Sequence, residues 1–258
     1  MIKLNVLLVS YNASPYIKQC VESIVRQRTS FHFNVIVADD YSTDDTVHKI
    51  KALADDSFIF LESNKNLGLK GNYKRGFAAC TAQYIAVMEG DDFWTDPRRL
   101  QKHVDFLDNH PECAMTSNNR ILANYHTGDF KAAFASTQAP YIYVNGIDTL
   151  TKFYGVNFST CVYKKHVIDK LPSNWFDITG AEVALNVMCL QYGLMGFFPD
   201  FMTVHRMHEE SLIAQLGRLN HAVLIKETAE IMKTHTGKKY EIEYDRIINE
   251  MDRRIYGG

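Results

Sequence analysis

The sequence lacks several features that mark particular classes of protein. No apolar run approaches the roughly 20 residues of a membrane-spanning helix, and the first residues lead into a strand-like pattern without the charged and apolar regions of a signal peptide. The five cysteines are scattered, without the paired spacing of a disulfide framework or a zinc site, which is typical of a reducing cytoplasm. Basic and acidic residues nearly balance at a formal net charge of −2, so nucleic acid is not an expected partner.

The composition is otherwise that of an ordinary globular protein. Its 258 residues are 46% hydrophobic and 22% charged, which is enough to bury a full core. This length allows one large α/β domain, either alone or with a small appendage.

Short apolar runs alternate with helical patterns through the first part of the chain. The runs at 4–9, 33–38, 58–61 and 85–88 are typical of buried strands, and an amphipathic helix is expected after each of them. Ser14 and Ser42 are the expected N-caps of the first two helices. This alternation predicts a parallel sheet with helices on both faces.

Polar residues follow three of these predicted strands. They are Ser-Tyr-Asn at 10–12, Asp-Asp at 39–40 and Glu-Gly-Asp-Asp at 89–92. Carboxylate oxygens suit Mg²⁺ or Mn²⁺, and these ions in turn suit diphosphates. A solvated acidic turn before a helix would explain one such pair equally well. Because the ends of parallel strands meet at one edge of the sheet, however, three of them favour a shared binding site.

The motifs also occur in a familiar order. The chain resembles family 2 glycosyltransferases of the GT-A fold over about residues 3–212. The segments that carry this resemblance are Val-Ser-Tyr-Asn (9–12), Ala-Asp-Asp-Tyr-Ser-Thr-Asp-Asp-Thr (38–46), Asn-Leu-Gly (66–68), Glu-Gly-Asp-Asp-Phe-Trp (89–94) and Thr-Asp-Pro-Arg-Arg-Leu-Gln-Lys-His-Val-Asp-Phe-Leu (95–107). The resemblance implies a Rossmann-like, mostly parallel sheet flanked by helices. It also implies inverting transfer of a sugar from a nucleoside diphosphate sugar, assisted by Mn²⁺ or Mg²⁺.

The resemblance assigns roles to residues at the strand ends. By position, Tyr11 and Asp40 would hold the nucleoside base, with uridine the first choice. Asp91 would bind the metal ion, and Asp92 would assist it or hold the ribose. Glu89 stands where the family more often has Asp, and its longer side chain would reach the ribose.

A second departure from the family pattern lies at 71–74, where Gly-Asn-Tyr-Lys replaces the commoner Ala-Ala-Arg-Asn. Asn72, within this segment, is assigned to donor binding. The role of the missing arginine passes to Lys70, Lys74 or Arg75 in this interpretation.

The second half supplies the remaining site residues that the resemblance implies. Glu182 stands where the family places its catalytic acid, at the start of a helix, and would be the general base. Asp177, five residues earlier, is its rival. Residues 205–211 resemble the family's Tyr-Arg-x-His-x-x-Ser signature, so Arg206 would meet the diphosphate and His208 would be a metal ligand.

The end of the chain is expected to be helical from about residue 212, with a break at Gly237. We therefore predict a GT-A domain over 1–215, with a nucleotide-sugar half at 1–110 and an acceptor half at 111–215, and a C-terminal helical extension at 216–258. The extension would dock on the core, pair with a second copy in a homo-oligomer, or lie against an anionic membrane face.

These expectations combine into one leading function and two alternatives. The leading function is transfer of a sugar to a glycan or lipid-linked saccharide acceptor in bacterial cell-surface polysaccharide synthesis, in the cytoplasm or at the inner face of the membrane. A nucleotidyltransferase would need a glycine-rich, basic loop after the first strand, which is missing. A catalytically inactive sugar-nucleotide-binding or scaffolding module would be expected to lose the metal acids or Glu182.

Overall fold

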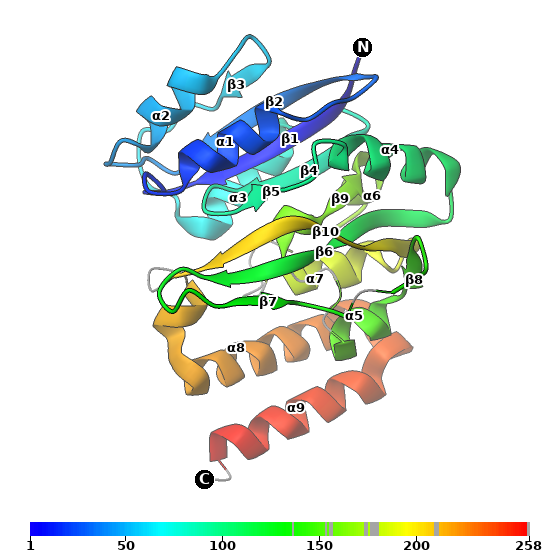
Figure 1. Ribbon diagram of the computed structural model, residues 1–258. Coiled ribbons are helices and arrows are strands. Elements are labelled where there is room, and N and C mark those ends of the chain that lie inside the picture. Colours follow the sequence, from blue (N-terminus) through cyan, green and yellow to red (C-terminus); the bar gives the residue numbers. More distant parts are fainter. Residues whose placement is uncertain are drawn as a thin grey trace.

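The computed structural model describes residues 1–135, 137–152, 154, 157–172, 175, 181–208 and 212–256 (Figure 1). Its strands are β1 Ile2–Ser10, β2 His32–Asp39, β3 Phe58–Phe60, β4 Tyr84–Glu89, β5 Phe93–Trp94, β6 Cys113–Asn124, β7 Phe130–Ala132, β8 Ile142–Val144, β9 Val162–Lys164 and β10 Leu194–Met207. Its helices are α1 Ile17–Val25, α2 Thr46–Leu53, α3 Gly68–Ala79, α4 Arg99–Asn109, α5 Gly146–Lys152, α6 Lys165–Ile168, α7 Ala181–Cys189, α8 Leu212–Thr236 and α9 Glu241–Tyr256, with short 3-10 segments η1 Phe158–Thr160 and η3 Gly237–Tyr240.

The strands join in one sheet in the order β3-β2-β1-β4-β9-β6-β10-β5, with β7 paired to β6 and β8 to β10. Strands β3, β2, β1 and β4 are parallel, as the alternating pattern predicts. Strand β9 is antiparallel to both β4 and β6, and β10 returns parallel to β6. The carboxyl ends of β1, β2 and β4 therefore lie along one edge.

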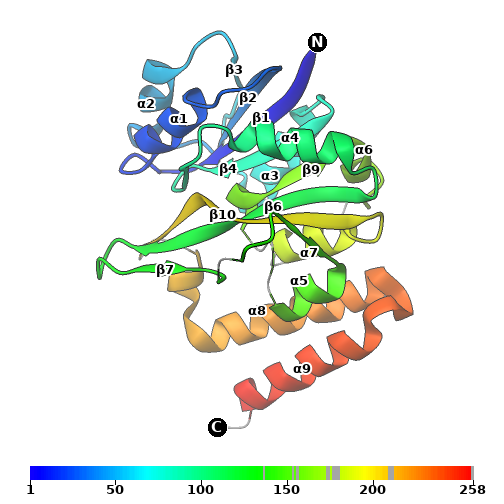
Figure 2. The same ribbon diagram turned by 45° about the vertical axis from the view of Figure 1, so that its right-hand side comes forward.

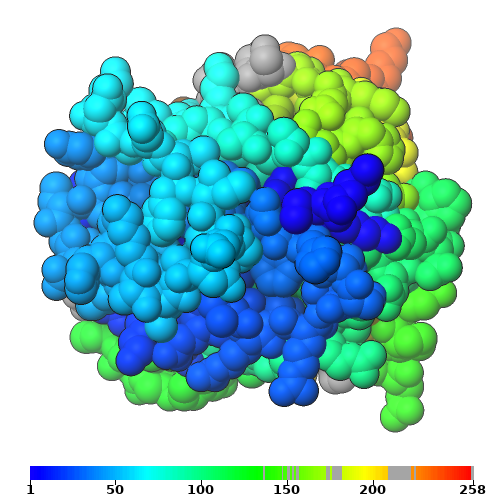
Figure 3. Space-filling model, turned by 90° about the horizontal axis from the view of Figure 1, so that it is seen from above, coloured from blue at the N-terminus to red at the C-terminus, as the bar shows by residue number. Residues whose placement is uncertain are grey.

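Helices cover both faces of this sheet, with α1 and α4 on one face and α3 and α7 on the other (Figures 1 and 2). Successive residues of β1 divide between the faces, because side chains alternate along a strand. Leu7 and Val9 pack with α3 and α7, whereas Val6 and Leu8 pack with α1 and α4. Viewed from above, the surface comes mostly from the first half of the chain (Figure 3).

The predicted caps of the first two helices are wrong. Helix α1 begins after Tyr16 and α2 after Asp45, so neither Ser14 nor Ser42 is an N-cap. The Ser42 hydroxyl instead donates to Asp39 Oδ1 at 2.6 Å. The Ser14 hydroxyl oxygen accepts from Lys49 Nζ at 2.6 Å. Both serine side chains thus form hydrogen bonds to charged side chains and do not cap the first turns of the helices.

Two other boundaries differ in the second half. Residues 158–163 (Phe-Ser-Thr-Cys-Val-Tyr) predict one strand from their sequence, but in the structure they divide into η1 and the shorter β9. The region 118–145, which shows no clear period, contains most of β6 and the strands β7 and β8. Buried polar residues such as Asn118 and Asn119, both 0% exposed, obscure the apolar alternation there.

Helices α8 and α9 pack against each other below the sheet (Figure 1). Gly237, with a φ of 61°, begins the segment that turns the chain between them. Met232, Tyr240 and Tyr244 belong to the same buried cluster as α3 and α7, so the tail docks on the body. None of the helices in the described ranges combines the length and apolar character that a membrane span requires.

Candidate active site

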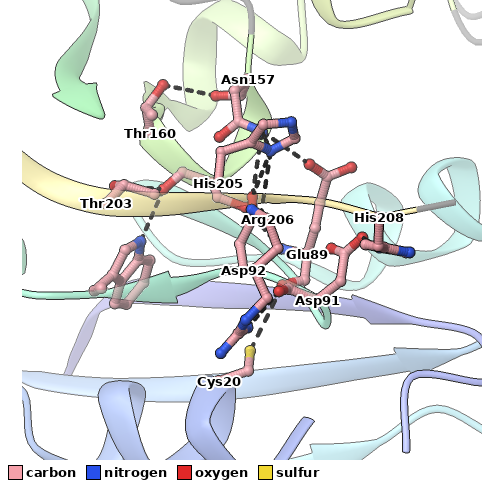
Figure 4. A network of polar contacts seen from close by, with 12 residues as sticks. Cys20, Glu89, Asp91, Asp92, Asn157, Thr160, Thr203, His205, Arg206 and His208 are labelled. Carbon is pink, nitrogen blue, oxygen red and sulfur yellow. Dashed lines mark hydrogen bonds and ion pairs between the residues drawn. The ribbon is translucent and has the colours of Figure 1, made fainter. Parts of the chain in front are cut away.

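Three acids stand at the carboxyl end of β4 and face side chains from β10 (Figure 4). Glu89 ends the strand, and Asp91 and Asp92 follow in the turn. Asp92 is completely buried, whereas the Asp91 side chain is 33% exposed. Gly90 lets the turn lie close to α1, since a Cβ there would stand 3.1 Å from the Ile17 side chain.

Glu89 is held by two neutral donors. The Tyr73 hydroxyl donates to Glu89 Oε1 at 2.6 Å, and the Asn157 amide donates to Oε2 at 3.3 Å. Burial, together with the charges of Glu182 and Asp91, raises the pKa of Glu89 well above its ordinary value. Burial among other acids thus favours the protonated form of Glu89 more than exposure to water would.

Asp92 is paired with a histidine. His205 Nδ1 lies 3.3 Å from Asp92 Oδ1, and the Arg206 amide donates to the same oxygen at 3.0 Å. Burial raises the pKa of Asp92 and is the largest single influence, but the charge of His205 and the hydrogen bonds from His205, Ser159 and the Arg206 backbone together hold the pKa below its ordinary value. Burial likewise lowers the pKa of His205, but the charge and hydrogen bond of Asp92, together with the charge of Asp91, raise it above its ordinary value. The lowered pKa of Asp92 and the raised pKa of His205 both favour the charged forms, as expected of an internal salt bridge.

Asn157 connects these two acids. Its Nδ2 lies 3.2 Å from Asp92 Oδ2 and 3.1 Å from His205 Nδ1, in addition to its contact with Glu89. Its Oδ1 is buried and has no hydrogen-bond partner among the described residues. One amide thus links the acid cluster to the strand β10.

Asp91 and His208 meet at the exposed side of the cluster. His208 Nε2 lies 3.1 Å from Asp91 Oδ2, and the His208 ring packs 4.8 Å from the Tyr16 ring. Across the ranges that the structure describes, no three His, Cys, Asp or Glu side chains form a metal cage. A carboxylate and an imidazole still fit Mn²⁺ or Mg²⁺, because such ions bind few protein ligands and fill their coordination with water and substrate phosphates.

Arg206 is buried behind this pair, with 2% of its surface exposed. Its guanidinium donates to the Asp91 carbonyl and to Gln19, and it lies 4.6 Å from the Phe93 ring and 5.2 Å from the Tyr125 ring. These contacts hold the acidic turn in place. Contact of Arg206 with a diphosphate stays a prediction.

The residues predicted to bind the nucleoside base directly follow the carboxyl ends of β1 and β2. Tyr11 is 52% exposed, and Asp40 is buried with its Oδ1 accepting from the Leu67 amide at 2.7 Å. The loops after β1 and β2 are joined, because the Asn12 amide donates to Ser42 Oγ at 2.9 Å. An exposed ring and a buried carboxylate thus stand on adjoining loops.

Asn72 is buried within α3 and is engaged by the protein at both ends of its amide. Its Nδ2 donates to the Ala38 carbonyl at 2.7 Å, and its Oδ1 accepts from Arg75 Nε at 2.8 Å. Arg75 also donates to the carbonyls of Glu62 and Asp39. The structure therefore shows Asn72 and Arg75 supporting the end of β2. Their contact with a donor stays a prediction.

Glu182, in the first turn of α7, belongs electrostatically to the same cluster. Burial raises its pKa to about 7, while the charges of His205 and Arg120 lower it and those of Asp92 and Asp91 raise it. The structure thus brings the predicted base into the field of the predicted metal acids. Asp177, its rival, lies outside the described residues.

Sequence reasoning missed four residues of this arrangement: Tyr73, Arg120, Asn157 and His205. His205 precedes Arg206 in the signature at 205–211, so the motif carried a signal for it. Asn157 carried none, because its partners are 48 to 68 residues away along the chain.

Comparison with known proteins identifies relatives by sequence. The model of the family "Glycosyl transferase family 2" matches residues 5–169. An uncharacterized protein of Mycobacterium tuberculosis is 29% identical over 213 residues, which are 81% of this chain and 60% of that protein. The Escherichia coli protein WfaP, named as a UDP-Glc:alpha-D-GlcNAc-diphosphoundecaprenol beta-1,3-glucosyltransferase, is 23% identical over 211 residues, 81% of this chain and 79% of its own. The chain thus spans about 60% of the length of its mycobacterial relative.

Solved structures share the fold. Staphylococcus aureus TarS (residues 1–349), in complex with UDP-GlcNAc, superposes with a TM-score of 0.71 at 16% identity, covering 99% of this chain and 73% of that one. The mannosyltransferase PcManGT of Pyrobaculum calidifontis, in complex with GDP-Man and Mn²⁺, gives 0.65 at 15% identity, covering 98% and 70%. The predicted GT-A type of α/β fold with C-terminal helices is confirmed. Because the family match extends over more than half of the sequence, this chain belongs to glycosyl transferase family 2.

Proposed function

We propose that this protein transfers a sugar, with inversion and with a divalent metal ion, from a nucleoside diphosphate sugar to an acceptor hydroxyl. The observation that carries the proposal is the convergence of Asp91, Asp92 and Glu182, from β4 and α7, within one electrostatic cluster. Membership of the family supports it, as do the nucleotide sugars named for TarS and PcManGT.

The donor would lie along the edge of the sheet. Tyr11 and Asp40 would hold the nucleoside base, with a uridine nucleotide as the first choice, and Asn72 would support this pocket. Glu89 would reach the ribose, and Asp92 would assist the metal site or hold the ribose. Arg206 would stand behind the diphosphate.

Asp91 and His208 would hold Mn²⁺ or Mg²⁺. When bound, such an ion supplies positive charge for the departing diphosphate. The chain's part is to fix the Asp91 carboxylate, which the Arg206 contact to the Asp91 carbonyl accomplishes.

Glu182 would take the proton of the acceptor hydroxyl. In an inverting transfer the acceptor oxygen attacks from the face opposite the leaving group, so the base would lie across the pocket from the metal. That Glu182 comes from α7 and Asp91 from the turn after β4 supports this assignment. A pKa near 7 suits a base that works close to neutral pH.

The biological setting is proposed from the relatives. WfaP is named for a lipid-diphosphate acceptor, so a glycan or lipid-linked saccharide in bacterial cell-surface polysaccharide synthesis is the proposed acceptor. The protein would work in the cytoplasm or at the inner membrane face, with α8 and α9 as the candidate surface for membrane or subunit contact. An inactive module is the less favoured function, since Glu182 and the acids after β4 share one site.

Metal-dependent donor binding tests this function. Asp91→Asn should weaken UDP binding in the presence of Mn²⁺ by at least about tenfold, because an amide binds the ion poorly. Calorimetric titration of UDP, with Mn²⁺ or with chelator, measures the effect. Asp200→Asn, which changes a carboxylate that is 60% exposed, is the matched control.

Release of UDP, dTDP and GDP from a panel of donor sugars, followed with Mn²⁺ as slow hydrolysis, identifies the nucleotide. Equal UDP affinity for the unchanged protein and Asp91→Asn, with and without metal, would refute the metal site. Release of no nucleotide from any donor would refute the transferase.

A further inference from the structure

Arg120 occupies the acceptor side of the site. It lies in β6, where its register partner is Thr203 of the neighbouring β10. Thr203 accepts a hydrogen bond from Asn118, and the strand β10 leads from there directly to His205 and Arg206. Arg120 therefore stands in the wall of the predicted acceptor half, close to the acid cluster.

The guanidinium of Arg120 has no partner among the described residues. Within the described ranges it makes no hydrogen bond and no ion pair, and its Nε is shut off from solvent without a partner. The two terminal nitrogens are not among the shielded atoms, so the end of the fork remains accessible. Arg75 and Arg206 differ, because their terminal nitrogens donate to carbonyl and amide oxygens.

The charged groups that act on Arg120 include the predicted base and one of the acids after β4. Burial lowers its pKa, and the carboxylates that oppose this are first Glu182 and then Asp92. Asp91, at the predicted metal site, is not among the groups that act on it. Arg120 in turn lowers the pKa of Glu182. The carboxylate charge that acts on the guanidinium thus comes from the candidate base and from Asp92.

A partly buried arginine without a hydrogen-bond partner is costly to keep. Desolvation of a charge is repaid only when hydrogen bonds and an opposite charge satisfy it. Among the residues that the structure describes, Glu182 and Asp92 supply opposite charge to Arg120 but make no hydrogen bond or ion pair with it. A ligand that brings its own oxyanion would complete the site, and a planar guanidinium fork binds phosphate or carboxylate through two parallel hydrogen bonds.

We propose that Arg120 binds an anionic group, phosphate or carboxylate, carried by the acceptor beside the hydroxyl that Glu182 deprotonates. This inference rests on the proposed transfer reaction and narrows its acceptor to an acidic or phosphorylated saccharide. The donor is the less favoured source of the anion, because its diphosphate would lie at Asp91.

The test uses the full chain saturated with UDP and Mn²⁺, so that the diphosphate site is filled. Three probes are titrated calorimetrically: α-D-glucose 1-phosphate, methyl β-D-glucuronide and the neutral methyl α-D-glucoside. A charge-assisted hydrogen bond contributes about 1.5–3 kcal/mol, so one anionic probe should bind roughly 10–100-fold more tightly than the neutral one. Tighter binding of the sugar phosphate would identify the anionic group as phosphate, and tighter binding of the glucuronide would identify it as carboxylate.

Arg120→Gln should remove that advantage and leave binding of methyl glucoside unchanged, and Arg120→Lys should keep part of it. Arg26→Gln, which changes an arginine with a 75% exposed side chain at the C-cap of α1, is the matched control and should bind as the unchanged protein does. UDP affinity, measured first for each variant, should stay within about threefold.

Three results would overturn the inference. They are equal binding of charged and neutral probes by the unchanged protein, retention of the advantage in Arg120→Gln, and a loss of UDP affinity in Arg120→Gln as large as the loss for the anionic probe. Failure of the unchanged protein to bind UDP at all would instead refute the proposed function. Thermal melting of each variant confirms that it is folded.

Discussion

At the scale of single residues, the site separates four carboxylates by their surroundings. Glu89 receives a phenol and an amide, Asp92 a charged imidazole, and Asp91 the ring of a partly exposed histidine. Glu182 accepts no hydrogen bond from any described residue and keeps a pKa near 7. Different environments thus shift the pKa of Glu89 and Glu182 upward and that of Asp92 downward, and such separation is how a site can divide roles among neighbouring carboxylates.

The pH dependence of turnover follows from Glu182. A base must be ionised to accept a proton, and burial raises the pKa of this carboxyl to about 7. Transfer to an acceptor should therefore fall about tenfold for each pH unit below 7 and level off above it. The measurement is kcat against pH with donor and acceptor both saturating.

Glu182→Gln should lose this dependence and lower kcat by roughly 10²–10⁴ while UDP affinity changes by only a few fold. Its melting temperature at pH 8 should not fall, because the amide needs no buried charge. Asp177→Asn is the parallel variant. If Glu182→Gln turns over normally and Asp177→Asn is inactive, the base has been assigned to the wrong residue.

The site was predictable where local pattern and family order agree. Asp40, Asp91 and Asp92 follow strands that are predictable from apolar runs. Because these strands are parallel, the three acids are expected at the same edge of the sheet. Asn157 was not predictable in this way, and the signature at 205–211 includes His205 without indicating its partner. Their contacts with Asp92 cross 65 and 113 residues of sequence, and only the folded chain brings them together.

At the scale of elements, the same contrast separates the two halves. Strands β1 to β4 are apolar runs between helices, so the local sequence pattern alone predicts them. Strand β6 buries Thr116, Ser117, Asn118 and Asn119 against polar partners, and such residues give no apolar period. Hydrogen bonds, rather than hydrophobic alternation, stabilise these inner positions.

A glycine controls how the tail meets α5. A Cβ on Gly146 would lie 2.6 Å from the Tyr240 hydroxyl oxygen and 2.8 Å from the ring, and Tyr240 is 4% exposed. Gly146→Ala gains about 1 kcal/mol of helix propensity but must displace the ring, so we expect a net loss of about 1–2 kcal/mol in the free energy of unfolding.

Denaturant unfolding measures this loss. Tyr240→Phe removes the nearest atom, so the double variant Gly146→Ala/Tyr240→Phe should recover part of the stability, which shows that the two sites are coupled. An unchanged free energy of unfolding in Gly146→Ala would mean that η3 does not press on α5 in solution. UDP affinity should not change in any of these variants.

At the scale of the whole molecule, the question is whether α8 and α9 form a separable extension. Their contacts give two opposing indications. Met232 and Tyr244 are 0% exposed and belong to the cluster that includes α3 and α7, so stability should depend on the tail. The residues proposed for the donor lie between Tyr11 and His208, before α8 begins, so binding should not depend on it.

A chain that ends near Arg218 distinguishes stability from binding. It loses Met232, Tyr240 and Tyr244, and each large buried side chain that is removed uncovers apolar surface worth about 1.5–3 kcal/mol. We expect a lower melting temperature and binding of a hydrophobic dye, but UDP affinity with Mn²⁺ within a few fold of the full chain. A second chain that ends at 240 removes only α9 and should lie between the two in stability, because it keeps Met232 and Tyr240. If the shorter chain unfolds cooperatively yet binds no UDP, the tail contributes to the donor site and the division at 215 is wrong. If it melts with the full chain, the tail's contacts with the core add nothing to stability, and the extension is free for a membrane or a second subunit.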